Sequence, residues 1–536
     1  MSWISRCRIL IELLLLGIVS GSSGEPAFLA SGEAVPTNRM LFGVNRPWPM
    51  SGQKLDDPEL LRALRALHVG ALRFPGGTVG SFWDLAAGRF VPEADINGFG
   101  FARWAAQYTR AAREISRLPA NQFGIQAFDK LARQICAGVC WVVNLATLSG
   151  EHEAEAISHM KTCGVELSYL ELGNEYDMGL FRRVMPKVSD YISRSHSVVE
   201  RARHLFPKAR IAVCASRVDL GAEEHVVEKQ KPSDERTRRW NEDLLKYRDT
   251  FDAWVVHDYG LGLNLLRKLS EADRLSAVLA YPQASLGAIA STIRTRYSGV
   301  PVWITEYNAA FHGLNREEPS RRDSAAAFLE NMKNSGLHAL MVAGYILSAV
   351  EDADIYKVLC YHSLSGMDGF GITKFNGNEP GTRCLVNASA QVFAHVASVA
   401  TNSSQMATAR IDNNPSLGLN LLGRNDLKAL QAAVFLSNSR VSYVVLNRSA
   451  RAASVALSVP DGFGKAVRTV YVAGGPPRPL PWFGLPEAEA ELPWPGPMKP
   501  ETTSLDITTD RVECEVPGTA LAIVELCRVE RGDPVR

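Results

Sequence analysis

Short apolar, β-rich runs recur along the first two thirds of the chain, and amphipathic stretches separate them. This alternation is typical of repeated βα units around a parallel sheet. It predicts eight strands: Met40 to Asn45, Ala71 to Phe74, Cys140 to Leu145, Leu167 to Leu172, Arg210 to Ala215, Ala253 to His257, Val302 to Thr305 and Leu340 to Leu347.

Helical periodicity fills the intervals between these runs. From Asp57 to Leu67, leucines recur at helical spacing and form one apolar face. The same pattern predicts helices at Phe123 to Ile135, Glu151 to Cys163, Val188 to Leu205 and Asp323 to Leu337. Eight strands with intervening helices favour an α/β fold, a closed (β/α)8 TIM barrel. An open doubly wound sheet is the alternative, and the position of the polar residues distinguishes the two, because in a barrel the functional groups lie at the C-terminal ends of several strands.

Beyond about residue 395, helical periodicity gives way to alternating strands. Predicted strands are Gln431 to Leu436, Ser442 to Asn447, Ser454 to Val459 and Ala520 to Leu526. They indicate a C-terminal β-sandwich domain, in which the proline-rich segment 474–500 forms a long loop. We therefore divide the chain into residues 1–24, the barrel at 25–385 and the β-domain at 386–536.

The first residues have the pattern of an export signal. Arg6 and Arg8 precede the apolar run Ile9 to Val19, and the small residues Ser20 to Gly24 follow it. The run is too short to span a bilayer. We expect a cleaved signal peptide, no membrane anchor after cleavage, and an extracellular protein, or a periplasmic one if the host is bacterial.

Loss of Cys7 with the signal leaves eight cysteines, an even set that permits disulfides in an exported chain. The pairs closest in sequence within their regions are Cys514 with Cys527 and Cys360 with Cys384, and we predict these two bonds. No CxxC pair or HExxH motif occurs, so we predict neither a metal nor another cofactor.

Charge excludes two classes of partner. The formal net charge is +1, and no block of like charges interrupts the chain. An electrostatic footprint for nucleic acid or an anionic membrane is therefore missing.

Two apolar runs end in a glutamate. YLELGNEYD, Tyr169 to Asp177, places Glu175 just past the fourth predicted strand, and PVWITEYN, Pro301 to Asn308, places Glu306 at the end of the seventh. Strands three apart face each other across the mouth of an eight-stranded barrel, so both carboxylates can converge on one substrate. Glycoside cleavage needs such a pair, one to protonate the leaving oxygen and one to attack or stabilise the anomeric carbon.

These two segments, together with LRFPGGT at Leu72 to Thr78, resemble the clan of retaining barrel glycosidases. The families most similar in appearance are the α-L-arabinofuranosidases, the heparanases and β-glucuronidases, and the β-xylosidases. The resemblance implies that Glu175 is the acid/base and Glu306 the nucleophile.

Neighbouring strand ends supply candidate binding residues. Arg73 would orient the nucleophile carboxylate by its opposite charge. The resemblance implies that Asn174 bonds the 2-hydroxyl of the sugar and that Tyr259 bonds the nucleophile. His257 is either a binding residue or a core histidine. Three further candidates are Trp141, whose ring would stack on a sugar or pack in the core, and the strand-end residues Asn144 and Asn308.

The chain is therefore expected to be a secreted retaining glycoside hydrolase whose partner is an oligo- or polysaccharide. No linear basic cluster suits long sulfated chains, which favours exo action on β-glucuronides or α-L-arabinofuranosides. Alternatives are a secreted carbohydrate-binding protein on an inactive glycosidase scaffold and a structural extracellular protein. Both glutamates argue against the first, and the polar strand ends argue against the second.

Overall fold

The computed structural model describes residues 27–528, apart from residues 52, 100–101, 120–121, 221–234, 312–313, 315–322, 334, 366–370, 372, 376–383, 474–497 and 509. The predicted signal peptide and most of the predicted proline-rich loop lie outside the described residues. Among the described helices, none combines the length and apolar character of a membrane span.

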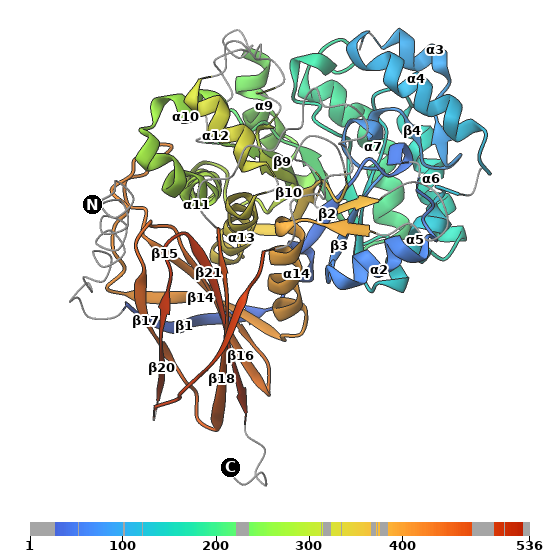
Figure 1. Ribbon diagram of the computed structural model, residues 1–536. Coiled ribbons are helices and arrows are strands. Elements are labelled where there is room, and N and C mark those ends of the chain that lie inside the picture. Colours follow the sequence, from blue (N-terminus) through green and yellow to red (C-terminus); the bar gives the residue numbers. More distant parts are fainter. Residues whose placement is uncertain are drawn as a thin grey trace, which may run out of the picture.

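Eight parallel strands close into a barrel, which confirms the predicted fold class (Figure 1). In barrel order they are β2 (Gly43–Asn45), β3 (Ala71–Phe74), β6 (Gly138–Val142), β7 (Tyr169–Glu171), β8 (Arg210–Cys214), β9 (Ala253–Gly260), β10 (Val302–Ala309) and β11 (Tyr356–His362). β11 pairs with β2 and closes the ring. Glu175 follows the fourth strand and Glu306 lies on the seventh, as predicted.

Helices surround the barrel on its outside (Figure 1). They are α2 (Pro58–Ala66), α3 (Glu93–Gly98), α4 (Ala102–Ser116), α5 (Ile125–Gln134), α6 (Gly150–Thr162), α7 (Val188–Leu205), α9 (Glu235–Leu245), α10 (Leu263–Lys268), α11 (Glu271–Arg296), α12 (Ser324–Met332), α13 (Gly336–Glu351) and α14 (Ala388–Thr401).

One predicted strand is wrong. Leu340 to Leu347 lies inside helix α13, and the eighth barrel strand is β11, which follows it. Every residue of α13 from Leu337 to Val350 is buried, because the helix is covered by the barrel on one side and the second domain on the other. A helix that is apolar all round lacks the polar face that distinguishes helix from strand in a sequence.

The second sheet has nine strands in the order β19, β18, β21, β16, β15, β14, β1, β17, β20. Their bounds are β1 (Ala27–Pro36), β14 (Gln405–Asp412), β15 (Leu430–Leu436), β16 (Arg440–Asn447), β17 (Ala453–Ser458), β18 (Phe463–Val472), β19 (Glu501–Leu505), β20 (Arg511–Val516) and β21 (Ala520–Arg528). The two end strands, β19 and β20, contact each other. The sheet thus folds back on itself around one apolar core, as a β-sandwich does.

Strand β1 belongs to this second sheet, although the sequence analysis assigned its residues to the barrel part. It pairs antiparallel with β14 and parallel with β17. Figure 1 shows it as a blue strand that crosses among the orange and red ones. The N-terminal end of the described chain therefore ties the β-domain to the barrel.

Two two-stranded sheets complete the fold: β4 (Trp83–Asp84) with β5 (Arg89–Phe90), and β12 (Thr373–Phe375) with β13 (Cys384–Val386). The first of these sheets and helices α3 and α4 form an insertion between β3 and α5.

The two predicted disulfides are not formed, since Cys360, Cys514 and Cys527 are free thiols. Cys360 belongs to the buried cluster inside the barrel, whereas Cys384 lies on the separate β12–β13 sheet. Cys514 is in register with Val455, while Cys527 is in register with residues of β16 and β18. Nearness in sequence does not make these cysteines neighbours in the sheet.

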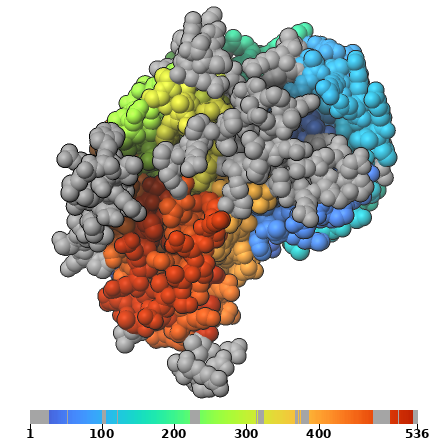
Figure 2. Space-filling model, viewed as in Figure 1, coloured from blue at the N-terminus to red at the C-terminus, as the bar shows by residue number. Residues whose placement is uncertain are grey.

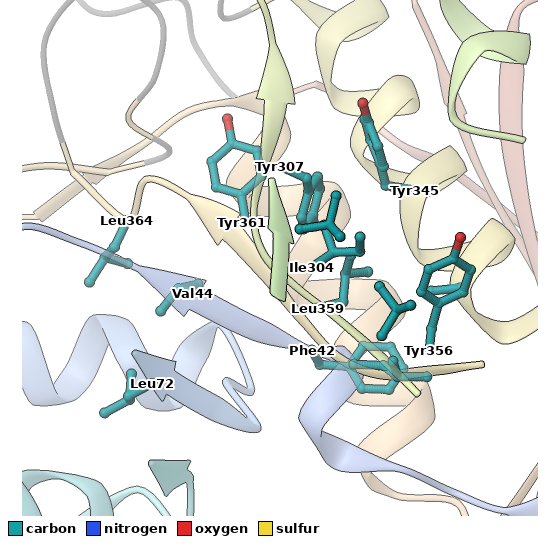
Figure 3. Packing of buried hydrophobic residues seen from close by; sticks show 14 of the residues in the cluster. Phe42, Val44, Leu72, Ile304, Tyr307, Tyr345, Tyr356, Leu359, Tyr361 and Leu364 are labelled. Atoms are coloured by element: carbon teal, nitrogen blue, oxygen red, sulfur yellow. The ribbon is translucent and has the colours of Figure 1, made fainter. Parts of the chain in front are cut away.

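Alternation along the strands sorts side chains to the two faces of the barrel wall. Outward-facing residues pack under the helices. Figure 3 shows Ile304 and Tyr307 of β10 in this layer near Tyr345 of α13, and the rings of the two tyrosines are 4.7 Å apart. Inward-facing residues at the N-terminal end form a small cluster of mostly small side chains around Trp303. This apolar cluster fills the N-terminal half of the barrel interior, and polar side chains occupy the C-terminal half.

The two domains pack closely. α13 contacts β14, β15, β16 and β21 of the β-domain. Gln431 of β15 donates a hydrogen bond to Ser348 Oγ of α13 at 3.0 Å. The space-filling view shows the β-domain, in orange and red, directly against the barrel (Figure 2). The β-domain thereby braces the barrel around its seventh and eighth units.

Because β1 lies between two strands of the β-domain, we expect its buried side chains to stabilise the folded protein. Leu29 of β1 is fully buried. We expect Leu29→Ala to lower the free energy of unfolding by about 2–5 kcal/mol, measured by urea denaturation. The control Glu33→Ala, at an exposed position of the same strand, should change it by no more than about 0.5 kcal/mol. Equal effects of both variants would contradict the position of β1 in the sheet.

Candidate active site

Polar side chains from six barrel strands meet inside the C-terminal mouth of the barrel. They come from β2, β3, β7, β9, β10 and β11, and they are Asn45, Arg73, Glu171, Asn174, Glu175, His257, Tyr259, Thr305, Glu306 and His362. Functional groups that lie at several strand ends are the hallmark of a barrel active site.

Arg73 is the centre of this layer and is fully buried. Its Nε and Nη2 donate to the two oxygens of Glu171 at 2.8 and 2.6 Å, and its Nη1 donates to Glu306 Oε1 at 2.6 Å. Nη2 also donates to Asn174 Oδ1 at 2.8 Å. One planar guanidinium thus fixes three side chains from two other strands.

A β-bulge brings two consecutive residues of β10 into the site. Ile304 pairs with Val256, but the next paired residue is Glu306, opposite His257. Thr305 is the extra residue, so both Thr305 and Glu306 reach the interior, where regular alternation would admit one.

Glu175 follows a tight turn after β7. Gly173 has φ +109°, and a Cβ there would lie 1.9 Å from the ring of Tyr176, so only glycine fits. Glu175 itself has φ +57°, a conformation that is costly for a residue with a side chain. Arg236 of α9 holds the following turn by donating to the carbonyl oxygens of Tyr176 and Asp177 at 2.7 and 2.6 Å.

The two predicted carboxylates meet in the mouth of the barrel. An oxygen of Glu175, an oxygen of Glu306 and a ring nitrogen of His257 all lie within 4.8 Å of one another. The Glu175 side chain is 22% exposed, whereas that of Glu306 is 7% exposed. An approach this close is what direct attack by one carboxylate needs, since the carboxyl groups of such a pair stand about 5–5.5 Å apart, against about 6.5–9.5 Å in an inverting enzyme.

The surroundings of Glu306 favour its charged form. Burial alone would raise the pKa of Glu306, but electrostatic interactions with His257, His362 and Arg73 and a hydrogen bond from Tyr259 lower it well below the usual range. Tyr259 donates to Oε2, and Asn45 Nδ2 donates to Oε1 at 3.1 Å. Burial and the charge of Glu306 raise the pKa of Tyr259, which keeps it a proton donor.

His257 joins the two carboxylates. Its Nδ1 lies 2.9 Å from Glu175 Oε1 and 3.7 Å from Glu306 Oε2. Burial alone would lower the pKa of His257, but Glu306 and Glu175 raise it. The same three side chains have the mutual spacing of metal ligands, yet Arg73 bonds Glu306 directly, and its fixed charge opposes a cation there.

Three sequence-predicted residues lie outside this cluster. Trp141 is fully buried, and its ring packs against those of Phe74 and Phe128, so it cannot stack on a ligand. Asn144 is buried and caps a turn by accepting from the amides of Ala146 and Thr147.

Asn308 lies behind the site. Its Nδ2 donates to the carbonyl oxygen of His362 at 2.5 Å, and its Oδ1 lies 2.8 Å from His338 Nε2. The buried side chain of Asn308 therefore connects β10 to β11 through hydrogen bonds and does not line the mouth of the barrel.

Four residues of the cluster were not predicted from the sequence: Asn45, Glu171, Thr305 and His362. Glu171 and Thr305 lie inside the two motifs that end near Glu175 and Glu306, three residues before Asn174 and one residue before Glu306, and these offsets offered a signal. Asn45 ends the first predicted strand. His362 offered no signal, because its strand was placed elsewhere.

Comparison with known proteins gives structural relatives only. No protein-family model matches the chain, and no curated protein matches it in sequence. Among solved structures, it is similar to a family 51 α-L-arabinofuranosidase from Bifidobacterium longum, with a TM-score of 0.65, 12% identity, and coverage of 94% of this chain and 100% of the other.

Two more solved structures have the same architecture. An α-L-arabinofuranosidase from Thermotoga maritima, solved as an arabinose complex, matches with a TM-score of 0.63 and 14% identity over 94% of this chain and 99% of the other. A family 44 xyloglucanase from Paenibacillus polymyxa matches with a TM-score of 0.52 and 10% identity over 94% and 100%. At identities this low the likeness shows the fold, a (β/α)8 barrel with a C-terminal β-domain.

The hydrogen bond from Tyr259 should be measurable in the titration of Glu306. We expect Tyr259→Phe to raise the pKa of Glu306 above its wild-type value, because the carboxylate loses a donor, in a ¹³C NMR pH titration. Tyr307→Phe is the control, since the Tyr307 hydroxyl is buried without a hydrogen-bond partner and belongs to the outer layer. An unchanged titration in Tyr259→Phe would contradict the assigned contact.

Proposed function

We propose that this protein is a retaining glycoside hydrolase, with Glu306 as the nucleophile and Glu175 as the acid/base. The observation that carries the proposal is the convergence of two carboxylates in unlike environments within 4.8 Å of each other. One is buried and held ionised by Arg73, and the other is more exposed and bonded to a histidine. Such a split gives one nucleophile and one proton donor.

In the first step, Glu306 attacks the anomeric carbon while Glu175 gives a proton to the leaving oxygen. The bond to the leaving group breaks, and its electrons stay on that oxygen. Arg73, Tyr259 and Asn45 hold the Glu306 carboxylate in place for this attack. The product is a glycosyl ester on Glu306.

In the second step, Glu175 takes a proton from water, and the water oxygen attacks the anomeric carbon. The ester bond breaks and Glu306 leaves as a carboxylate. Two inversions restore the original configuration of the sugar. Asn174, whose amide Arg73 and Glu175 orient, is placed to bond the 2-hydroxyl in both transition states.

As the substrate we propose an α-L-arabinofuranoside, released by exo action, with β-glucuronides as the second class. The arabinofuranosidases among the structural relatives support the first class. The predicted export signal in residues 1–24 supports action outside the cytoplasm, on oligo- or polysaccharides.

Azide rescue tests the roles of the two glutamates. Glu306→Gly should lose at least about 10³-fold in kcat/KM on an aryl glycoside and, with azide, form the glycosyl azide of inverted configuration. Glu175→Ala with azide should form the azide of retained configuration, because azide then intercepts the ester. A Glu306→Gly variant as active as wild type would refute the assignment.

A panel of aryl glycosides tests the substrate class. We expect wild type to turn over the α-L-arabinofuranoside with the highest kcat/KM, and Glu306→Gly serves as the control for contaminating activity. Highest activity on the β-glucuronide would favour the second class. If calorimetry detects saccharide binding while no glycoside is cleaved, the protein is a carbohydrate-binding protein and the hydrolase proposal fails.

A further inference from the structure

The proposed mechanism leaves one buried carboxylate of the site without a task. Glu171 ends strand β7, four positions before Glu175, and is completely buried. It is bonded through both oxygens to Arg73, and its Oε1 also accepts a hydrogen bond from the Thr305 hydroxyl at 3.4 Å. Thr305 Oγ1 lies 3.2 Å from His257 Nε2, and His257 Nδ1 lies 2.9 Å from Glu175 Oε1.

These contacts form a relay, Glu171–Thr305–His257–Glu175, whose proton positions follow from donor counting. The carboxylate of Glu171, ion-paired with Arg73, has no proton to donate, so Thr305 must be the donor in their bond. A threonine hydroxyl has one proton. Toward His257, Thr305 is therefore an acceptor, and His257 must carry a proton on Nε2.

A proton on Nε2 of His257 limits what the other ring nitrogen, Nδ1, can do. Nδ1 then either accepts a proton from Glu175 or, in the imidazolium form, donates one to it. In both forms a single proton lies between Nδ1 and Glu175 Oε1. The alternative neutral tautomer, with Nδ1 protonated and Nε2 bare, would point two acceptors at each other along the relay.

We propose that Glu171 is a positioning residue that acts through Thr305 and His257: it fixes the tautomer of His257, so that Glu175 shares its catalytic proton with His257 Nδ1. This inference rests on the proposed function. When the glycosidic bond breaks, the shared proton passes to the leaving oxygen, and the Nδ1–Glu175 contact is left without it. In the second step the pair takes one proton back from the attacking water.

The second role of Glu171 is electrostatic. Its charge compensates Arg73 whether Glu306 is a carboxylate or an ester, so the buried guanidinium keeps a partner through the whole cycle. The Glu171–Arg73 pair therefore connects the nucleophile to the relay that serves the acid/base.

Thr305→Val tests the relay, because it removes one hydroxyl and leaves the Arg73–Glu171 pair intact. Loss of proton donation affects poor leaving groups most, since a good leaving group departs without a proton. We expect kcat/KM for methyl or phenyl glycosides to fall about tenfold or more, and that for dinitrophenyl glycosides to stay within about twofold. Glu171→Gln, whose amide can donate to Thr305 and so release its hydroxyl toward Nε2, should show the same selectivity.

Thr37→Val is the matched control, because Thr37 Oγ1 is buried without a hydrogen-bond partner far from the site. It should leave both classes of substrate unaffected. Equal losses on both leaving-group classes in Thr305→Val, or no loss on either, would overturn the relay.

The tautomer is measured directly by ¹⁵N NMR of labelled protein, with His257 assigned from the signals lost in His257→Asn. We expect Nε2 to be protonated in wild type and the proton to move to Nδ1 in Thr305→Val. A bare Nε2 in wild type would refute the inference. This readout needs no turnover, so it separates failure of the relay from failure of the proposed function, which would appear as a wild type that cleaves no glycoside.

Discussion

The ion pairs of Arg73 with Glu171 and Glu306 are the constraint on which the site depends. Moving three charged groups out of water costs several kcal/mol for each ion, and only short, well-aligned hydrogen bonds can offset that cost. All three contacts measure 2.6–2.8 Å. The guanidinium is planar and its two carboxylate partners lie on separate strands, so these contacts restrict how the three strands can be placed relative to one another. The register of β3, β7 and β10 is thereby fixed at the mouth of the barrel.

Two local irregularities turn this frame into a site. The bulge in β10 delivers Thr305 and Glu306 to the interior together, and the glycine turn after β7 lifts Glu175 out of the strand toward solvent. In regular strands, inward-facing side chains would lie at depths along the barrel axis that the strand pairing alone sets. The irregular ones place a buried carboxylate and an accessible one at different depths, which is what a nucleophile and a proton donor require.

The sequence was sufficient to predict the barrel and the pair of glutamates. Each glutamate follows an apolar run, and the order of that run along the chain also gives the place of its strand in the barrel. The sequence was not sufficient where an element is buried on all sides and has no polar face. Helix α13 is apolar on every side, so Leu340 to Leu347 resembled a strand. Trp141 looked like a stacking residue because sequence alone cannot say which face of β6 meets α5. Glu171 was overlooked because its partners, Arg73 and Thr305, come from distant parts of the chain and only the folded register brings them together.

The most direct test of the central claim is to trap the enzyme with an activated 2-fluoro-glycoside and to sequence the labelled peptide by mass spectrometry. A retaining enzyme of the kind described accumulates the fluoroglycosyl ester, and the label should lie on Glu306 within the peptide that spans β10. A label on Glu175 or Glu171, or hydrolysis with inversion and no label at all, would contradict the assignment of Glu306 as the buried nucleophile that Arg73 holds in place.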